Sequence, residues 1–151
     1  MKEIWKPIKD YEGLYEVSNF GNVRSLDHKR ANRYSYYIQK GKLLKAGLNK
    51  KTGYLTVVLS KEGKYSTRRI HRLVAEAFMT DRSDFKSMPY EDRDMVNLDE
   101  LEVNHKNEFE KWNNKVDNLE WCTTKYNANY GTKSKRISEK MSIFKSKMKV
   151  W

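Results

Sequence analysis

Four polar residues between positions 104 and 127 carry the chemistry that this sequence offers: one histidine and three asparagines. Asn104 directly precedes His105, Asn118 follows the histidine after thirteen residues, and Asn127 comes nine residues later. An imidazole with an ordinary pKa of about 6.5 can take a proton from water near neutral pH. Amide oxygens suit a hard divalent ion such as Mg²⁺ or Mn²⁺. These residue types are therefore compatible with metal-assisted attack of water on a phosphodiester.

Short strands and one helix must position these side chains. The sequence predicts strands at 101–103 and 119–122, with a polar loop between them. A helix should follow, with Thr123 or Thr124 as its N-cap and Gly131 near its end. His105 then lies at the end of the first strand and Asn127 in the helix. At a strand end the side chains of Asn104 and His105 can diverge, so that one faces a cation and the other water.

The rest of the chain predicts an α+β fold. A small hairpin is expected around the turn at 18–22, and a second strand pair at 54–59 and 65–69, joined by a turn at 61–64. From Ile70 the period becomes helical, with an apolar stripe that continues to Phe78. Ile137, Met141, Phe144 and Met148 predict an amphipathic helix in the C-terminal tail.

Three motifs then occur in order over residues 3–130. They are the His…Asn…Asn set with the segment 118–123, the run His-Arg-Leu-Val-Ala at 71–75, and the segments 5–8 and 11–25. Together they resemble HNH homing endonucleases of phages that carry an N-terminal nuclease-associated modular DNA-binding module. The resemblance implies a β-rich DNA-binding module at 1–66, a ββα-metal nuclease unit at 67–131 and a basic helical tail at 132–151.

The resemblance also implies a role for each residue of the set. His105 would be the catalytic base, Asn104 and Asn127 would bind one Mg²⁺ or Mn²⁺ ion, and Asn118 would support catalysis by tying the loop backbone. An acid can precede the histidine in this family, whereas this chain has Asn104. We expect the neutral amide to weaken metal binding.

Charge favours double-stranded DNA as the partner. The formal net charge is +11, although the segment 81–102 carries eight acidic and three basic residues and should face away from DNA. The residues expected to contact DNA are Arg24, Lys29, Arg30, Arg33, Lys45, Arg72, Lys133, Lys135, Arg136 and Lys140. With one lone cysteine, Cys122, no internal disulfide can form, and simple packing is expected for it. His71 is expected to be structural.

Two other classes of protein stay open. One is a DNA-binding protein whose HNH unit is weak or inactive, and the other is an RNA-binding protein. For a nuclease, a single ββα unit in a monomer predicts nicking of one strand. No apolar run is long enough for a bilayer, and no signal-peptide pattern is found at the N-terminus. Together with the family resemblance, this predicts a phage-encoded protein that acts in the cytoplasm of a bacterial host.

Overall fold

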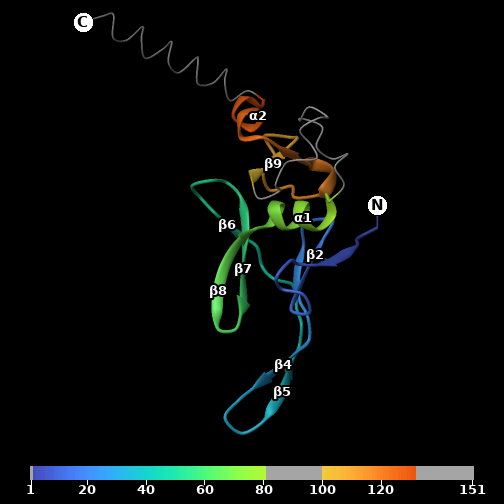
Figure 1. The fold of residues 1–151 in the computed structure, drawn as a ribbon, viewed down its shortest axis with the longest axis vertical. Coiled ribbons are helices and arrows are strands. Elements are labelled where there is room, and N and C mark those ends of the chain that lie inside the picture. The colour runs from blue at the N-terminus through green and yellow to red at the C-terminus, as the bar shows by residue number, and fades with distance from the viewer. Residues whose placement is uncertain (1, 81–99, 132–151) are drawn as a thin grey trace, which may run out of the picture.

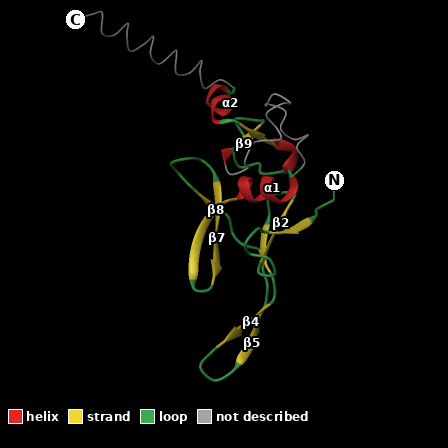
Figure 2. Cartoon of the chain, in the orientation of Figure 1, coloured by secondary structure: helices red, strands yellow, loops and turns green. Residues whose placement is uncertain are grey.

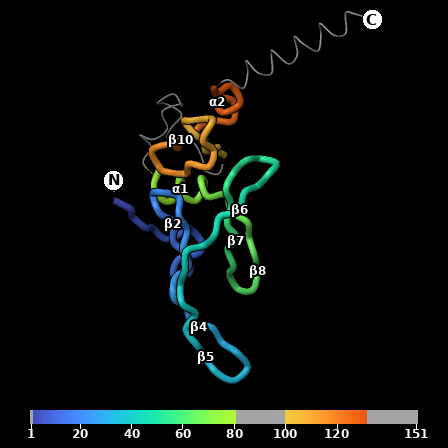
Figure 3. Tube along the Cα trace, turned by 180° about the vertical axis from the view of Figure 1, so that it is seen from behind, coloured from blue at the N-terminus to red at the C-terminus, as the bar shows by residue number. Residues whose placement is uncertain are grey.

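A computed structural model describes residues 2–80 and 100–131, and it confirms an α+β fold (Figures 1 and 2). Helix α1 (Ile70–Phe78) lies in the middle of the molecule, with two sheets of the N-terminal half on one side (Figure 1). On its other side is the strand pair of the C-terminal half, β9 (Glu102–His105) and β10 (Leu119–Cys122). The tube view from behind shows the same arrangement (Figure 3). The expected helix of the tail, most of the acidic segment, and Lys133, Lys135, Arg136 and Lys140 lie outside the described residues.

The first sheet is antiparallel and contains β1 (Trp5–Pro7), β2 (Tyr15–Ser18) and β3 (Val23–Ser25). It confirms the hairpin expected around residues 18–22. The Ser18 hydroxyl accepts backbone N–H bonds from Phe20 and Asn22, at 3.3 and 3.1 Å, which holds the turn. Gly21 adopts φ +85°, a conformation that glycine reaches without steric cost.

The second sheet is also antiparallel and contains β6 (Gly47–Leu48), β7 (Leu55–Lys61) and β8 (Lys64–Arg69). The strand pair expected at 54–59 and 65–69 is therefore confirmed. Val57 and Leu59 are buried, whereas Val58 between them is 57% exposed, because successive side chains point to opposite faces. One face of β7 thus contributes to the core.

A hairpin of β4 (His28–Ala31) and β5 (Tyr36–Gln39) extends away from the body of the molecule (Figure 1). No strand was predicted from the sequence in this segment. The periodicity gave no signal because most side chains of the hairpin are exposed on both faces, including Tyr34 at 87% and Tyr36 at 77%. No buried face selects apolar residues here.

Helix α1 (Ile70–Phe78) confirms the expected helical stripe. Ile70, Leu73 and Val74 are almost completely buried, and the helix contacts strands of both N-terminal sheets as well as β9 and β10. Each such aliphatic side chain stabilises the fold by about 1.5–3 kcal/mol. Arg69 at its N-cap makes no side-chain capping bond, so packing rather than capping holds this helix.

The C-terminal unit contains β9 (Glu102–His105), a 3₁₀ turn η4 (Val116–Asn118), β10 (Leu119–Cys122) and α2 (Thr124–Asn129). Strand β9 begins and ends slightly later than expected, so His105 lies within it. The N-cap of α2 is Thr123, whose hydroxyl accepts a 3.1 Å bond from the Tyr126 N–H.

One apolar cluster joins both halves of the chain. It includes Val17 and Val23 from the first sheet, Leu73 from α1, and Leu119 and Trp121 from β10. The indole of Trp121 also donates a 2.9 Å bond to the Met79 carbonyl just after α1. The domain boundary at residue 66 stays a prediction. Among the described residues, no helix is long and apolar enough to cross a membrane.

A substitution at Gly21 tests the contact between the N-terminal hairpin and the loop that carries Asn114. A Cβ at this position would lie 2.7 Å from Asn114 Cβ, in addition to the strain of a positive φ. Gly13 has a similar φ of +76° but open space around it. We expect Gly13→Ala to lower the free energy of unfolding by about 1 kcal/mol and Gly21→Ala by about 3 kcal/mol, measured by urea denaturation. Equal losses in the two variants would contradict a tight contact at Asn114.

Candidate functional site

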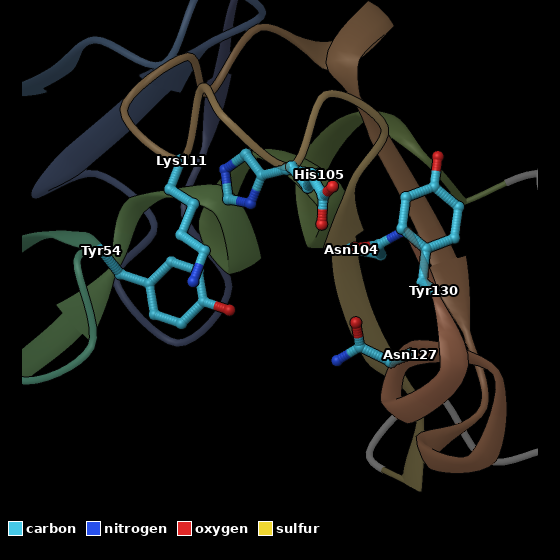
Figure 4. A pocket seen from close by; sticks show the side chains of 7 residues that line it. Tyr54, Asn104, His105, Lys111, Asn127 and Tyr130 are labelled. Carbon is cyan, nitrogen blue, oxygen red and sulfur yellow. The ribbon is translucent and has the colours of Figure 1, made fainter. Parts of the chain in front are cut away.

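A cleft opens between β9, the loop that follows it, and α2. Its lining residues are Tyr54, Asn104, His105, Glu108, Lys111, Asn127 and Tyr130 (Figure 4). Figure 4 shows His105, Tyr54 and Lys111 grouped on one side, with Asn104, Asn127 and Tyr130 on the other. The cleft thus brings together three of the four residues that the sequence singled out, and Asn118 lies outside its lining.

Alternation along β9 separates the two kinds of side chain. His105 pairs in register with Leu119 and belongs to the buried face that also carries Val103 and Trp121. Asn104 pairs with Glu120 and belongs to the opposite face, together with Glu102. Helix α2 contacts β9, and the side chain of Asn127 reaches Glu102 on that face.

His105 is held by a hydrogen bond and by two rings. Its Nε2 lies 3.1 Å from the Oδ1 of Asn114, a buried residue in the loop before η4. Since an amide oxygen only accepts, Nε2 carries the proton and Nδ1 keeps the lone pair. Tyr54 stacks on the imidazole with ring centroids 5.8 Å apart, and His71 meets its edge at 5.1 Å.

The environment of His105 favours the neutral base. Burial lowers the pKa of its imidazole below the ordinary value, and the nearby Lys111 ammonium acts in the same direction. The hydrogen bond to Asn114 opposes both by raising the pKa. The net shift is downward, so the imidazole is available to accept a proton at neutral pH.

His71 is buried on α1 beside His105 and does not line the cleft. Its ring lies 4.5 Å from that of Tyr54, and its Nδ1 has no hydrogen-bond partner among the described residues. Burial lowers the pKa of His71 to about 3, with smaller contributions from His105, Arg69 and Arg72. A structural role is what the sequence analysis expected, and these contacts support it.

Asn104 and Asn127 are oriented by carboxylates. The Asn104 amide donates a 2.8 Å bond from Nδ2 to Glu120 Oε1, and the Asn127 amide donates from Nδ2 to Glu102 Oε2. Within the described chain, no hydrogen bond is donated to either amide oxygen. Oxygen donors of this kind fit a hard divalent ion. The described residues contain no group of three or more His, Cys, Asp or Glu side chains suited to a metal.

Asn118 holds the loop between β9 and β10. Its Oδ1 accepts a 3.0 Å bond from the Asn107 N–H, and its Nδ2 donates a 2.9 Å bond to the Asn113 carbonyl. Its own carbonyl accepts from the Lys106 N–H at 2.8 Å. These are the contacts of a residue that ties a loop, and they keep Asn114 and His105 at the same end of the strands.

Other cleft residues gave no signal in the sequence. Tyr54 precedes β7, and Lys111 lies over its ring with Nζ 5.3 Å from the centroid. The Tyr130 hydroxyl donates a 2.9 Å bond to the Lys106 carbonyl. Burial raises the pKa of Tyr130, and the carboxylates of Glu120 and Glu108 add to the shift. Tyr54 was the first residue of the strand expected at 54–59, and Tyr130 lay next to the expected end of α2, but neither pattern marked a site residue.

Cys122 is buried, as expected for a packing residue. Burial raises the pKa of its thiol to about 12, and the carboxylates of Glu120 and Glu102 act in the same direction. Its thiol therefore stays protonated at neutral pH and is a poor nucleophile.

The residues expected to contact DNA fall into two groups. Lys29 and Arg30 on β4, Arg33 in the hairpin turn and Lys45 are exposed. By contrast, Arg24 pairs with Glu16 at 2.6 Å, and its guanidinium lies over the Trp5 ring at 4.2 Å.

Arg72 is also engaged within the molecule. It donates a 3.3 Å bond to the Leu101 carbonyl and approaches Glu76 at 3.7 Å. Both Arg24 and Arg72 therefore have structural contacts that DNA binding would have to share.

Comparison with known proteins identifies relatives over most of the chain. Residues 3–60 match the NUMOD4 motif. The DNA endonuclease I-HmuI of Bacillus phage SP01 is 39% identical over 123 residues, which is 82% of this chain and 54% of that protein. A protein named as an uncharacterized HNH endonuclease, L245 of Acanthamoeba polyphaga mimivirus, is 35% identical over 126 residues, or 83% of this chain and 29% of the relative.

A solved structure is similar as well. The structure that describes DNA binding and cleavage by the HNH homing endonuclease I-HmuI aligns with a TM-score of 0.57 and 32% identity. The alignment covers 90% of this chain and 66% of that chain. This chain thus spans about half the length of I-HmuI, and less than a third of L245.

His71 predicts a pH dependence of stability. Its pKa is about 3 in the folded protein and about 6.5 in an unfolded chain, so the unfolded state binds the extra proton between these values. His71 therefore does not lower the free energy of unfolding above about pH 6.5. As the pH decreases from there toward 3, protonation of His71 in the unfolded state lowers this free energy by at most about 1.4 kcal/mol per pH unit. In His71→Leu the slope between pH 6 and pH 4 should be shallower, measured by urea denaturation. The same slope in both proteins would contradict a buried neutral His71.

Proposed function

Because this chain belongs to the HNH homing endonuclease family related to I-HmuI and carries an N-terminal NUMOD4 motif, we propose that it hydrolyses phosphodiester bonds in double-stranded DNA. The observation that carries the proposal is the common cleft of His105, Asn104 and Asn127. In this cleft a neutral imidazole with a free Nδ1 lone pair adjoins two amides whose oxygens receive no hydrogen bond from the described residues.

His105 is the general base in this proposal. Nε2–H donates to Asn114, so Nδ1 takes the proton from the attacking water. The stacked Tyr54 ring and the edge of His71 limit rotation of the imidazole. Asn118 contributes by holding the loop that carries Asn114, without contact with the reacting atoms.

Asn104 and Asn127 are the proposed ligands of one Mg²⁺ or Mn²⁺ ion, through their amide oxygens. When bound, such an ion supplies Lewis-acid stabilisation of charge on the phosphate and the leaving oxygen. Glu120 and Glu102 fix the orientation of the two amides by accepting from their nitrogens.

DNA binding is assigned to the exposed basic residues of the N-terminal half. Lys29, Arg30 and Arg33 lie on or beside the β4–β5 hairpin, and Lys45 lies on the following segment. Exposed cations of this kind gain affinity by releasing counterions from phosphates. Arg24 and Arg72, with the tail residues Lys133, Lys135, Arg136 and Lys140, remain in the proposed set.

A monomer with one HNH unit is proposed to nick one strand in each binding event. A phage source and action in the cytoplasm of a bacterial host complete the proposal, by analogy with the phage origin of I-HmuI. One observation favours a second candidate, an inactive DNA-binding protein: the residue before His105 is the neutral Asn104.

Removal of the imidazole tests the reaction. With supercoiled plasmid and Mn²⁺ or Mg²⁺, the wild-type protein should produce open circles, and EDTA should prevent this. His105→Ala should be slower by about 10²–10⁴-fold, because general base catalysis has this magnitude, while a binding gel shows unchanged DNA binding. DNA binding without nicking by the wild-type protein in either metal would support the inactive candidate instead.

The pH profile of a Lys111 variant tests the assignment of His105 as the general base. Its ammonium lowers the pKa of His105, so Lys111→Met should raise that pKa and move the acid limb of single-turnover nicking to higher pH. The profile would be measured between pH 5 and pH 8 with saturating DNA and metal. Lys64→Met, on β8 and outside the cleft, is the matched control and should leave the limb in place. A limb that does not move in Lys111→Met would argue against His105 as the titrating group.

A further inference from the structure

The face of the β9–β10 ribbon that carries Asn104 also carries two carboxylates. Glu120 is directly opposite Asn104 in the register, and Glu102 precedes Asn104 by two residues on the same strand. Each carboxylate accepts a hydrogen bond from one of the proposed ligand amides: Glu120 from Asn104 at 2.8 Å, and Glu102 from Asn127. The two ligands are therefore bound to two separate anions.

These bonds determine which end of each amide faces the cleft. An amide has two N–H donors and one carbonyl oxygen, and the carboxylates here occupy nitrogen donors. The oxygens of Asn104 and Asn127 are left for a cation, and both residues line the cleft. A charge-assisted bond to the nitrogen also increases the negative charge on the amide oxygen, which strengthens it as a ligand.

The charges of Glu102 and Glu120 are not balanced by neighbouring cations in the described chain. Ion pairs within residues 2–80 and 100–131 involve Glu16, Asp27 and Glu76, and neither Glu102 nor Glu120 has a basic partner within 4.0 Å there. Glu102 and Glu120 are diagonal neighbours on this face, paired with Cys122 and Asn104, so their like charges repel each other less than directly opposite charges would. A divalent ion at the amide oxygens would offset this repulsion.

We infer that Glu102 and Glu120 are positioning residues for the metal ion, and that they supply the anionic charge which the two neutral ligands lack. The inference rests on the proposed function, because it concerns the same metal site. It explains how a site with asparagine rather than an acid before His105 can hold a divalent ion. The charge lies one hydrogen bond behind the ligands instead of on them.

Metal affinity without DNA tests the inference directly. Mn²⁺ binding to the full chain would be measured by the loss of the free Mn²⁺ signal in electron paramagnetic resonance. Glu120→Gln and Glu102→Gln should each weaken Mn²⁺ binding by at least about tenfold, since residues that orient metal ligands have effects of this size. Glu62→Gln, in the β7–β8 turn, is the matched control and should bind as the wild type does.

Two further measurements separate charge from folding. The melting temperature of metal-free Glu120→Gln should equal or exceed that of the wild type, because the variant removes a repulsion. The double variant Glu120→Gln with Asn104→Asp moves the charge across the hydrogen bond, with the introduced glutamine amide now donating to the new carboxylate. We expect it to restore Mn²⁺ affinity to within about threefold of the wild type, well inside the range of a single ligand-orienting contact.

The outcomes distinguish this inference from the proposed function. If the wild type binds Mn²⁺, Asn127→Ala loses that binding and the glutamate variants keep wild-type affinity, the inference is wrong and the metal site stands. Failure of the charge-moving double variant to recover affinity would also overturn it. If the wild type binds no Mn²⁺ at millimolar concentration and nicks no plasmid, both the inference and the proposed function fail.

Discussion

The alternation of side chains along β9 is the constraint on which the site depends. It turns His105 toward α1 and the core, while Asn104 and Glu102 face α2. A shift of one residue in the register with β10 would exchange these faces, so that the imidazole would point toward α2 and the amide toward α1 and the core. Leu119 and Trp121, which are completely buried on the same face as His105, make that shift very unfavourable.

Burial then sets the chemistry of His105. Three elements surround the imidazole: α1 through His71, the segment before β7 through Tyr54, and the loop before η4 through Asn114. That loop rests on the N-terminal hairpin, because the Val116 N–H donates to the Asn19 carbonyl at 3.0 Å and Gly21 lies against Asn114. The orientation of the base is therefore determined in part by the NUMOD4 region, which the sequence analysis treated as a separate DNA-binding module.

The opposite face shows a different electrostatic balance. Glu102 and Glu120 raise the pKa of the Cys122 thiol, and Glu120 also raises that of the Tyr126 hydroxyl, in both cases after the larger effect of burial, so both groups remain neutral. The two amides at the cleft are oriented by the same carboxylates. Across the cleft, Lys111 contributes positive charge beside His105. Negative charge thus lies beside the two amides of the cleft, whereas positive charge lies beside His105.

Local pattern alone was enough to predict the hairpin at 18–22, the β7–β8 pair, α1 and the β10–α2 segment with its threonine cap. Each of these has a buried face or a turn chemistry that the sequence records within a few residues. The positions of His105, Asn104 and Asn127 in one cleft followed from the motif. The β4–β5 hairpin was missed because exposed side chains on both faces leave no periodicity. Asn114, Tyr54, Glu102 and Glu120 could not be identified either, since their roles arise from strand register and from contacts between distant segments. Only the tertiary structure decides which polar residue of a loop reaches a buried imidazole, and which carboxylate stands opposite an amide.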